Sequence, residues 1–411
     1  MSLSSSQQRQ SPPPSLTNIN PNSENEAAGQ IPFPANTIIH SPPINLSHPI
    51  PTSNLPSKTI LITGGASGFG ATCCRSWASH HAIVIIGDIN ARAGEELVAE
   101  VRQSTGNQNL HFIQLDVTSW TSQVEFFDQA ARLSPHGGID CVIANAGIAD
   151  AEENRKFEEP EPNQIKPGPT SITASITTGG RAGASPDGSP GASPPTLKTI
   201  DVNLYGVLYT THLALHYLPR NPGSRPCDPD THTGPRDRHL LLVSSIAGLA
   251  GLPSQPLYAA AKHAVVGLFR TLRMTAPMKC GVRVNMINPY FVDTPILGPL
   301  GALLLAGGGM ATLESVLQAT TRLVADQGII GRALVIGPKT SAEHARAVGL
   351  EPDIVDQAVW DVYAHDFEQS DLFTRRVIGV TNLITRARGW TGLASDIANK
   401  ASYGFWKMLG Y

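Results

Sequence analysis

One glycine-rich stretch limits the fold of this chain more than any other feature: LITGGASGFG, residues 61–70. An apolar run ends there in four glycines within seven positions. A Gly-rich turn between a strand and a helix lets the backbone approach a phosphate, and the helix N-terminus adds free N–H groups and a positive dipole end. The stretch therefore predicts a βα unit with an anion-binding turn, although a lone glycine pattern also occurs in plain turns.

Three of these glycines have distinct predicted roles. Gly64 would form the turn, Gly68 would allow close approach of the phosphate, and Gly70 would pack the helix on the strand. Their spacing, Gly-x3-Gly-x-Gly, differs from the GxGxxG form. Ser67 and Phe69, which lie between them, belong to the same predicted cofactor loop.

The chain beyond this stretch repeats the same kind of unit. Continuous apolar runs alternate with segments of helical spacing, which is typical of βαβ units around a parallel sheet covered on both faces. The sequence therefore predicts an α/β fold with a parallel sheet. The expected strands are 58–65, 82–88, 110–117, 139–147, 239–248, 282–289 and 331–338, and the expected helices are 70–81, 91–103, 122–133, 197–218, 257–276 and 312–326.

Composition separates this core from less regular segments of the 411-residue chain. Residues 1–56 are rich in Ser, Pro and Asn and poor in large apolar side chains, so we expect a disordered N-terminal segment. The core domain is expected over 57–338, with loop insertions at about 151–196 and 220–238 that are either genuine or intron-derived. The glutamates that open the first insertion are expected on a solvated loop.

Residues 339–411 are expected to form a helical C-terminal extension. Apolar positions at helical spacing favour a helix packed on the surface of the domain. Three other roles stay open: a lid over the substrate pocket, a dimer contact, or a basic amphipathic segment that touches a membrane surface.

Charge and cysteine content argue against several classes of protein. The formal net charge is -3 with no long basic block, which gives no support for nucleic-acid binding. We expect no membrane span, because no run of 18 apolar residues exists, and no secretory signal or transit peptide. The five cysteines form no CxxC pair and no histidine lies at a metal-ligand spacing, so we expect a reducing, cytoplasmic location and no metal site.

The second expected strand ends in a carboxylate that bears on the choice of cofactor. Asp88 follows the glycine loop at close to the roughly twenty-residue spacing of an acid that binds the adenosine ribose. Such a carboxylate would repel a 2′-phosphate, and no Arg or Lys in the loop or directly after Asp88 would attract one. We therefore expect NAD rather than NADP. The alternative is that Asp88 caps the following helix.

A later helix contains YAAAK, which places Tyr258 and Lys262 on one helix face. A tyrosine is ordinarily a weak acid, with a pKa of about 10. A nearby ammonium and a cationic nicotinamide would favour the phenolate and lower that pKa, so that the tyrosine exchanges a proton with a substrate hydroxyl. Ser245, at the end of its strand, would hold the substrate oxygen. Taken alone, a Tyr/Lys pair is usually only a solvated helix edge.

Together, TGGASGFG, ANAG, SSIAG and YAAAK resemble the signature motifs of the short-chain dehydrogenase/reductase family. Their order matches as well, and Ser245 lies 13 residues before Tyr258, as the pattern of that family requires. The resemblance covers residues 58–338. It implies a Rossmann-like doubly wound parallel sheet in a single core domain, with the substrate site beside the nicotinamide. NPYFVDTPIL and GRALVIGP are most similar to the hydroxyprostaglandin-dehydrogenase-like subgroup, which includes fungal secondary-metabolite alcohol dehydrogenases.

The resemblance implies a role for each matching residue. Tyr258 would be the general acid/base, and Lys262 would lower its pKa and bind the nicotinamide ribose. Ser245 would position the substrate oxygen, and Asn203 in DVNLYG would hold a water in the proton relay. The cofactor would also contact Asp116 and Val117 at the adenine, Asn145, Ala146 and Gly147 of the NAG segment, and Pro289, Val292 and Thr294, which close on the nicotinamide and pyrophosphate.

One departure from the family pattern is Tyr290, where glycine usually follows the proline; a tyrosine there reshapes the loop or lines the substrate pocket. The apolar stretch from Tyr290 onward is expected to form a flexible substrate loop. The sequence thus predicts an NAD-dependent enzyme that interconverts a secondary alcohol and a ketone. The alternatives are an NADPH-dependent ketoreductase and a non-catalytic nucleotide-binding regulatory module. A homo-oligomer is a further expectation by resemblance.

Overall fold

The computed structural model describes residues 39–160, 194–230, 234, 236–297, 309–339, 341, 343, 346 and 357–363. All of these belong to one compact unit, Ile38–Phe367. Several predictions lie outside the described residues: most of the N-terminal disorder, the centre of the first insertion, part of the substrate loop, and nearly all of the C-terminal extension with its proposed lid, dimer and membrane roles.

The described strands form a single sheet in the order β3-β2-β1-β4-β5-β6-β7-β8. All neighbouring strands from β3 to β7 are parallel, and β8 is antiparallel to β7. The order changes direction between β1 and β4, and this switch point is where open sheets of this kind bind ligands. The strands are β1 Thr59–Thr63, β2 Ile83–Asp88, β3 Leu110–Gln114, β4 Cys141–Ala144, β5 His239–Val243, β6 Arg283–Pro289, β7 Ala333–Ile336 and β8 Val359–Asp361.

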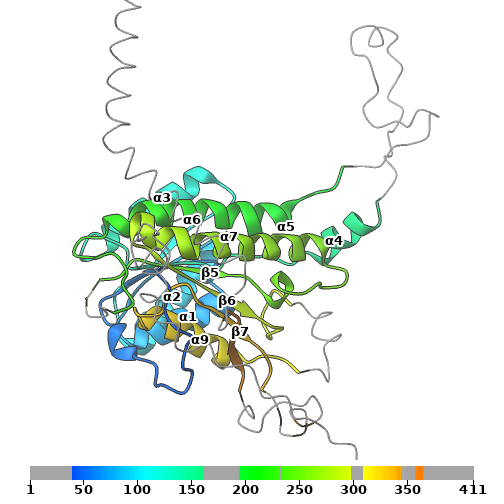
Figure 1. The fold of residues 1–411 in the computed structure, drawn as a ribbon. Coiled ribbons are helices and arrows are strands. Elements are labelled where there is room, and N and C mark those ends of the chain that lie inside the picture. The colour runs from blue at the N-terminus through cyan, green and yellow to red at the C-terminus, as the bar shows by residue number, and fades with distance from the viewer. Residues whose placement is uncertain are drawn as a thin grey trace, which may run out of the picture. The chain divides into compact units, whose positions relative to one another are not determined.

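Helices cover both faces of this sheet (Figure 1). One face carries α1 (Gly68–Ser79), α2 (Ala91–Thr105) and α9 (Leu313–Ala325), and the other carries α3 (Trp120–Leu133), α6 (Gly206–Tyr217) and α7 (Pro256–Cys280). Because both faces are covered, β1 and β5 are buried at every position. Their sequences are therefore continuous apolar runs rather than alternating ones. The predicted Rossmann-like parallel sheet is confirmed.

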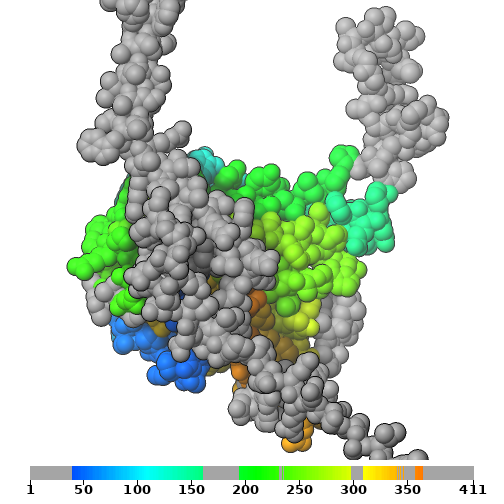
Figure 2. All heavy atoms as spheres, in the orientation of Figure 1, coloured from blue at the N-terminus to red at the C-terminus, as the bar shows by residue number. Residues whose placement is uncertain are grey.

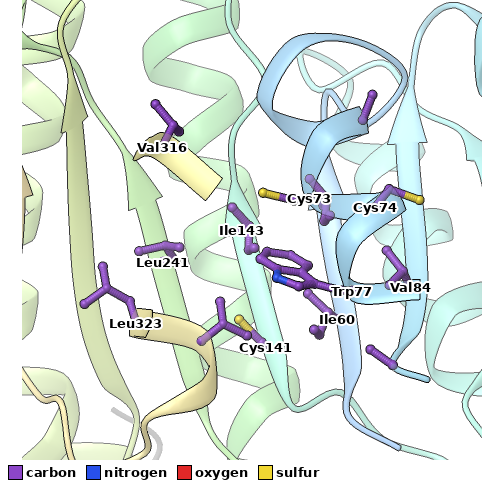
Figure 3. Packing of buried hydrophobic residues seen from close by; sticks show 14 of the residues in the cluster. Ile60, Cys73, Cys74, Trp77, Val84, Cys141, Ile143, Leu241, Val316 and Leu323 are labelled. Atoms are coloured by element: carbon purple, nitrogen blue, oxygen red, sulfur yellow. The ribbon is translucent and has the colours of Figure 1, made fainter. Parts of the chain in front are cut away.

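Each face of the sheet has its own apolar cluster. In the cluster under α1, Trp77 lies among Ile60, Cys141 and Ile143 from β1 and β4 (Figure 3). The indole N–H of Trp77 donates to the Thr321 hydroxyl of α9 at 2.9 Å, so its buried polar atom has a partner. Burying each large side chain of this kind stabilises the fold by about 1.5–3 kcal/mol.

The described end of the N-terminal segment, residues 39–56, packs on the core instead of being disordered. Leu55 is fully buried, and the hydroxyl of Ser41 bonds to the backbone of Ile330. Arg322 of α9 donates to the carbonyl of His48 at 2.7 Å. The structure differs from the prediction because the few apolar side chains of this segment, Leu55 among them, pack on the core of the domain, and polar contacts add to this packing.

The start of the first predicted insertion is helical. Residues Ala151–Glu158 form α4, where the side chain of Asp150 caps the helix by accepting from the N–H of Glu153 at 3.0 Å. Exposed ion pairs join Arg155 to Glu152, one helical turn before it, and to Glu159, one turn after it. The expected solvated loop is therefore wrong for these residues, because local capping and ion pairs stabilise a helix.

One other prediction, the helical C-terminal extension, differs from the structure in its described part. β8 lies inside the segment expected to be a helical extension, and it pairs with the exposed edge of β7. The second predicted insertion, 220–238, joins the core at both of its ends. Asn221 donates to Asp140 at 2.8 Å, and Asp237 forms ion pairs with Lys58 and Arg283.

Candidate active site

The glycine-rich loop lies at the carboxyl end of β1. Gly64 and Gly68 have φ angles of 64° and 50°, in the left-handed region that favours glycine. A Cβ added to Gly70 would lie 2.6 Å from the carbonyl oxygen of Gly64, and one added to Gly65 would lie 2.4 Å from the Cβ of Ile86. The loop is therefore a close-packed cradle with no room for side chains, as a bound pyrophosphate requires.

The first turn of α1 has no side-chain cap. Ser67 occupies the N-cap position but makes no side-chain hydrogen bond to the helix. By contrast, Asn90, Ser119 and Thr312 cap α2, α3 and α9 with their own side chains. Phe69 packs against the apolar core instead of covering the turn. This N-terminus fits an anionic ligand.

Asp88 ends β2 directly beside the loop. One carboxylate oxygen accepts the N–H of Ala66 at 3.0 Å, and the other accepts the N–H of Asn90 at 3.0 Å. Asn90, not Asp88, caps α2, because its side chain accepts the N–H of Ala93 at 3.1 Å. The helix-cap alternative for Asp88 is therefore wrong, and its carboxylate is held against the glycine-rich loop.

The NAG segment after β4 closes on the same loop. The side-chain amide of Asn145 donates to the carbonyls of Thr63 and Gly64, both at 2.9 Å. The Thr63 hydroxyl accepts the N–H groups of Asn145 and Ala146, both at 3.1 Å. A Cβ added to Gly147 would lie 3.7 Å from the Lys262 ammonium. The switch point between β1 and β4 thus brings the NAG segment between the loop and the catalytic candidates.

Three catalytic candidates meet at the carboxyl end of β5. The Ser245 hydroxyl is close enough to the phenol of Tyr258 to affect its pKa, and it lies 3.4 Å from the carbonyl oxygen of Pro289. Lys262 is buried, donates to the Val243 carbonyl at 3.1 Å, and has its nitrogen 5.6 Å from the centre of the Tyr258 ring. The structure therefore brings these three side chains together.

Burial controls the acidity of this pair. It raises the pKa of the Tyr258 phenol above its ordinary value, and the hydrogen bond from Ser245 offsets only part of this shift. Burial also lowers the pKa of the Lys262 ammonium to about 8. Burial is the largest cause of the shift in the Tyr258 pKa, because the charged phenolate loses water. The lower pKa predicted for Tyr258 beside a cationic nicotinamide stays a prediction.

Asn203 lies in η3 (Asp201–Tyr205), a π-helical turn between α5 (Lys198–Ile200) and α6. Its fully buried side chain accepts the N–H of Ile148 and donates to the Ile148 carbonyl, both at 2.8 Å. Such π-turns often occur at functional sites. Asn203 therefore joins the start of α6 to the NAG segment beside Gly147.

The segment after β6 lies across from the glycine-rich loop. The side chain of Thr294 lies 3.7 Å from a Cβ added to Gly68, and Val292 forms a bridge with Ala311. The rings of Tyr290 and Phe291 meet edge to face at 4.9 Å. Two of the three residues expected to close on the cofactor, Pro289 and Thr294, thus contact Ser245 and the loop respectively.

Asp116 and Val117 follow β3 and make different contacts. The Asp116 carboxylate accepts both the N–H and the hydroxyl of Thr118, in its own turn. Val117 is buried against the start of α6, where a Cβ added to Gly206 would lie 2.9 Å from its methyl carbon. Asp116 therefore stabilises its own turn, and Val117 packs on α6. Their predicted contact with the adenine stays a prediction.

The sequence assigned no role to several residues that shape the site. Gly248 lets η5 (Ile246–Gly248) approach α7, because a Cβ there would lie 2.6 Å from the carbonyl oxygen of Lys262. The Ser244 hydroxyl donates to the same carbonyl at 3.0 Å. Asn154 of α4 binds the first turn of α7. The glycine of SSIAG was a usable signal for Gly248, but nothing in the sequence connects Asn154 with α7.

The described residues offer neither a metal site nor a membrane span. Within these ranges, no group of three or more His, Cys, Asp and Glu side chains is placed to hold a metal ion. No helix in the same part of the chain is long and apolar enough to cross a bilayer. The candidate site therefore consists of the glycine-rich loop, the NAG segment and the Ser245, Tyr258 and Lys262 group.

Comparisons with known proteins agree with this arrangement. The family model described as short chain dehydrogenase matches residues 58–167 and 193–302. The unmatched gap falls within the first predicted insertion, whereas the second predicted insertion lies inside the match.

Two relatives have names that describe dehydrogenases. A 5'-hydroxyaverantin dehydrogenase of Dothistroma septosporum is 33% identical over 295 residues, covering 70% of this chain and 86% of the relative. The 15-hydroxyprostaglandin dehydrogenase of Mus musculus, specified as NAD(+), is 29% identical, covering 58% of this chain and 69% of the relative.

Solved structures show the same fold. A 3-ketoacyl-(acyl-carrier-protein) reductase from Brucella melitensis complexed with NADH has a TM-score of 0.50 and 20% identity, covering 69% of this chain and 98% of the other. Levodione reductase also has a TM-score of 0.50 and 20% identity, covering 71% of this chain and 98% of the other. At this identity the likeness concerns the fold alone.

Proposed function

Because the chain belongs to the short-chain dehydrogenase/reductase family and is an oxidoreductase acting on CH–OH groups, we propose that it interconverts a secondary alcohol and a ketone with NAD. The observation that carries the proposal is the meeting of Ser245, Tyr258 and Lys262 beside the NAG segment. Four motifs that lie far apart in the sequence thus meet at the carboxyl ends of the strands.

Each of these side chains has a chemical task. Tyr258 takes the proton of the substrate hydroxyl during oxidation and returns it during reduction. Ser245 holds the substrate oxygen, since its hydroxyl faces the same phenol that exchanges the proton. An oxidised nicotinamide, when bound here, supplies the hydride acceptor and a positive charge that favours the phenolate. Lys262 binds the nearby ribose, and Asn203 holds a water that relays the proton.

NAD fits the residues present better than NADP. The uncapped N-terminus of α1 would bind the pyrophosphate, and the Asp88 carboxylate stands beside the glycine-rich loop to accept hydrogen bonds from ribose hydroxyls. A 2′-phosphate would meet this negative charge. The Mus musculus relative, which is specified as NAD(+), supports the same choice.

The proposed substrate is an apolar or aromatic secondary alcohol. Tyr290 and Phe291, the aromatic pair after β6, are candidates for the pocket wall. The two relatives are named for hydroxylated compounds, and a substrate of this kind suits secondary metabolism. A homo-oligomer and a cytoplasmic location stay predictions.

The test is an oxidation assay on the full chain, with NAD and a panel of apolar and aromatic secondary alcohols. Tyr258→Phe is expected to lower kcat by about a hundredfold or more, because general acid–base catalysis contributes that much. A fluorescence titration should give the same Kd for NADH as the wild type. Near-normal turnover in this variant would contradict the role of Tyr258.

The alternatives have different outcomes in the same assay. A ketoreductase would reduce the matching ketones faster with NADPH than with NADH. A regulatory module would bind a cofactor without turnover in either direction.

A further inference from the structure

Two helices lack a side-chain cap of their own: α7, which carries Tyr258 and Lys262, and α5, which leads directly into the turn that carries Asn203. α7 begins at Pro256, and its N-cap residue, Gln255, makes no side-chain hydrogen bond to the helix. α5 begins at Lys198 and follows Leu197, which has no polar side-chain atom. By contrast, α2, α3, α4 and α9 are each capped by their own N-cap side chain.

Consecutive residues of α4 supply both missing caps. Asn154 accepts the N–H of Leu257 at 2.9 Å and the N–H of Tyr258 at 3.4 Å. Its neighbour Glu153 accepts the N–H of Lys198 at 2.6 Å and also bonds to the backbone and hydroxyl of Thr199. Both α4 side chains are buried, where an unpaired N–H group would be costly.

α4 lies at the end of the molecule where α5 and α7 begin (Figure 1). In the space-filling view, its teal atoms adjoin the green atoms of the chain that leads into α5 (Figure 2). One helix of eight residues therefore contacts the first turns of both segments.

α4 is also tied to the NAG segment. The backbone carbonyl of Asp150 accepts the side-chain amide of Asn154 at 2.7 Å, and the Asp150 side chain caps α4. Two residues earlier, Ile148 pairs with Asn203 through both of its backbone groups. Hydrogen bonds, together with the short backbone link from Ile148 to Asp150, thus join the chain just after the NAG segment to α4, the first turn of α7 and the turn that precedes Asn203.

We propose that α4 positions the catalytic groups, with Asn154 fixing the first turn of α7 and Glu153 fixing the turn ahead of Asn203. Tyr258 lies in the turn that Asn154 holds, and Lys262 follows one turn later on the same helix. A local cap would satisfy the same N–H groups, but it would not tie the helix to the NAG segment. The inference rests on the proposed function and adds positioning residues that act through Tyr258 and Asn203.

Two substitutions at one position separate the hydrogen bond from the volume. Asn154→Leu keeps a similar volume and removes the acceptor, whereas Asn154→Asp keeps an acceptor and adds a charge that suits a helix N-terminus. We expect kcat to fall by about ten- to a hundredfold in Asn154→Leu, because a small displacement of a catalytic group costs that much. The Kd for NADH should not change, and Asn154→Asp should recover most of the rate.

Asn107→Leu is the matched control. Asn107 is also a buried asparagine, and it donates to the carbonyls of Ala78 and Ala82 near the amino end of β2. This variant should lower the melting temperature and leave kcat unchanged. If Asn154→Leu also loses only stability, or if Asn154→Asp is as slow as Asn154→Leu, the positioning role is wrong.

A titration of the Tyr258 phenol tests the inference without turnover. The ultraviolet titration of each variant, minus that of the same variant with Tyr258→Phe, isolates this one phenol. Its pKa should lie above the ordinary value in the wild type, because burial raises it. Asn154→Leu should move it toward the ordinary value, and Asn107→Leu should not. An unchanged titration would overturn the positioning role.

The failure of the proposed function has a separate signature. If the wild type oxidises no alcohol and reduces no ketone, the proposed function fails. The phenol titration and the Asp and Leu variants then still decide whether Asn154 holds Tyr258 in place.

Discussion

The two ends of the sheet bury charge in different ways. At the amino ends of β1, β5 and β6, the Asp237 carboxylate lies 2.7 Å from both the Lys58 ammonium and the Arg283 guanidinium. Both cations also donate to backbone carbonyls of α9, among them that of Val324. At the carboxyl ends, Lys262 is also buried, but it donates to the carbonyl of Val243 and burial alone accounts for its lowered pKa.

The two ends differ in whether a buried charge has a partner of opposite charge within the chain. Burial raises the pKa of the Asp237 carboxyl, but Arg283 and Lys58 lower it by more, so that the carboxylate stays ionised and its charge is balanced within the chain. Burial lowers the pKa of the Lys262 ammonium to about 8. An ammonium has three N–H donors, so a ligand that accepts hydrogen bonds from it would stabilise its charged form. The amino end therefore balances its buried charges within the chain, whereas the carboxyl end holds a buried ammonium that has a carbonyl partner.

The largest expected effect on stability is at the amino end. Asp237→Asn should lower the free energy of unfolding by about 3–5 kcal/mol, because two buried cations lose their counter-charge. Urea unfolding of the wild type and the variant measures the difference. A loss under about 1 kcal/mol would mean that the carbonyls alone satisfy Lys58 and Arg283.

The matching change at the carboxyl end should lower activity without lowering stability. Lys262→Met removes a buried ammonium and keeps its apolar stem, so the free energy of unfolding should stay the same or rise. The kcat value should fall by about a hundredfold, because the phenolate loses its nearby cation. The same urea series and the alcohol assay test both parts. A loss of stability as large as that of Asp237→Asn would break the comparison between the two ends.

The smallest effect is expected at Asp88, a carboxylate at the carboxyl end. Asp88→Asn keeps an acceptor for the N–H of Ala66 and removes the charge, so the free energy of unfolding should change by less than about 0.5 kcal/mol. The preference for NADH over NADPH should narrow by about tenfold, the effect of one nearby charge in a partly solvated site. Fluorescence titrations with both cofactors measure it. An unchanged preference would remove Asp88 from the cofactor site.

Features that depend on local geometry could be predicted from the sequence. The turn at Gly64 and Gly68 needs positive φ angles, and only glycine adopts these without strain. Tyr258 and Lys262 share a helix face because four residues make about one helical turn. Buried strands are apolar at every position, so the parallel sheet and its covered faces follow from the pattern of residues.

The contacts between distant segments could not be predicted in this way. Asn154 caps α7, and Asp237 pairs with Lys58, because the strand order β1-β4-β5-β6 brings together chain segments that are far apart in sequence. The raised pKa of Tyr258 has the same origin, since burial depends on all the elements packed around the phenol. Local residue patterns specify the elements and the motifs, whereas the assembled sheet and helices determine which polar groups lose water and which partners they find.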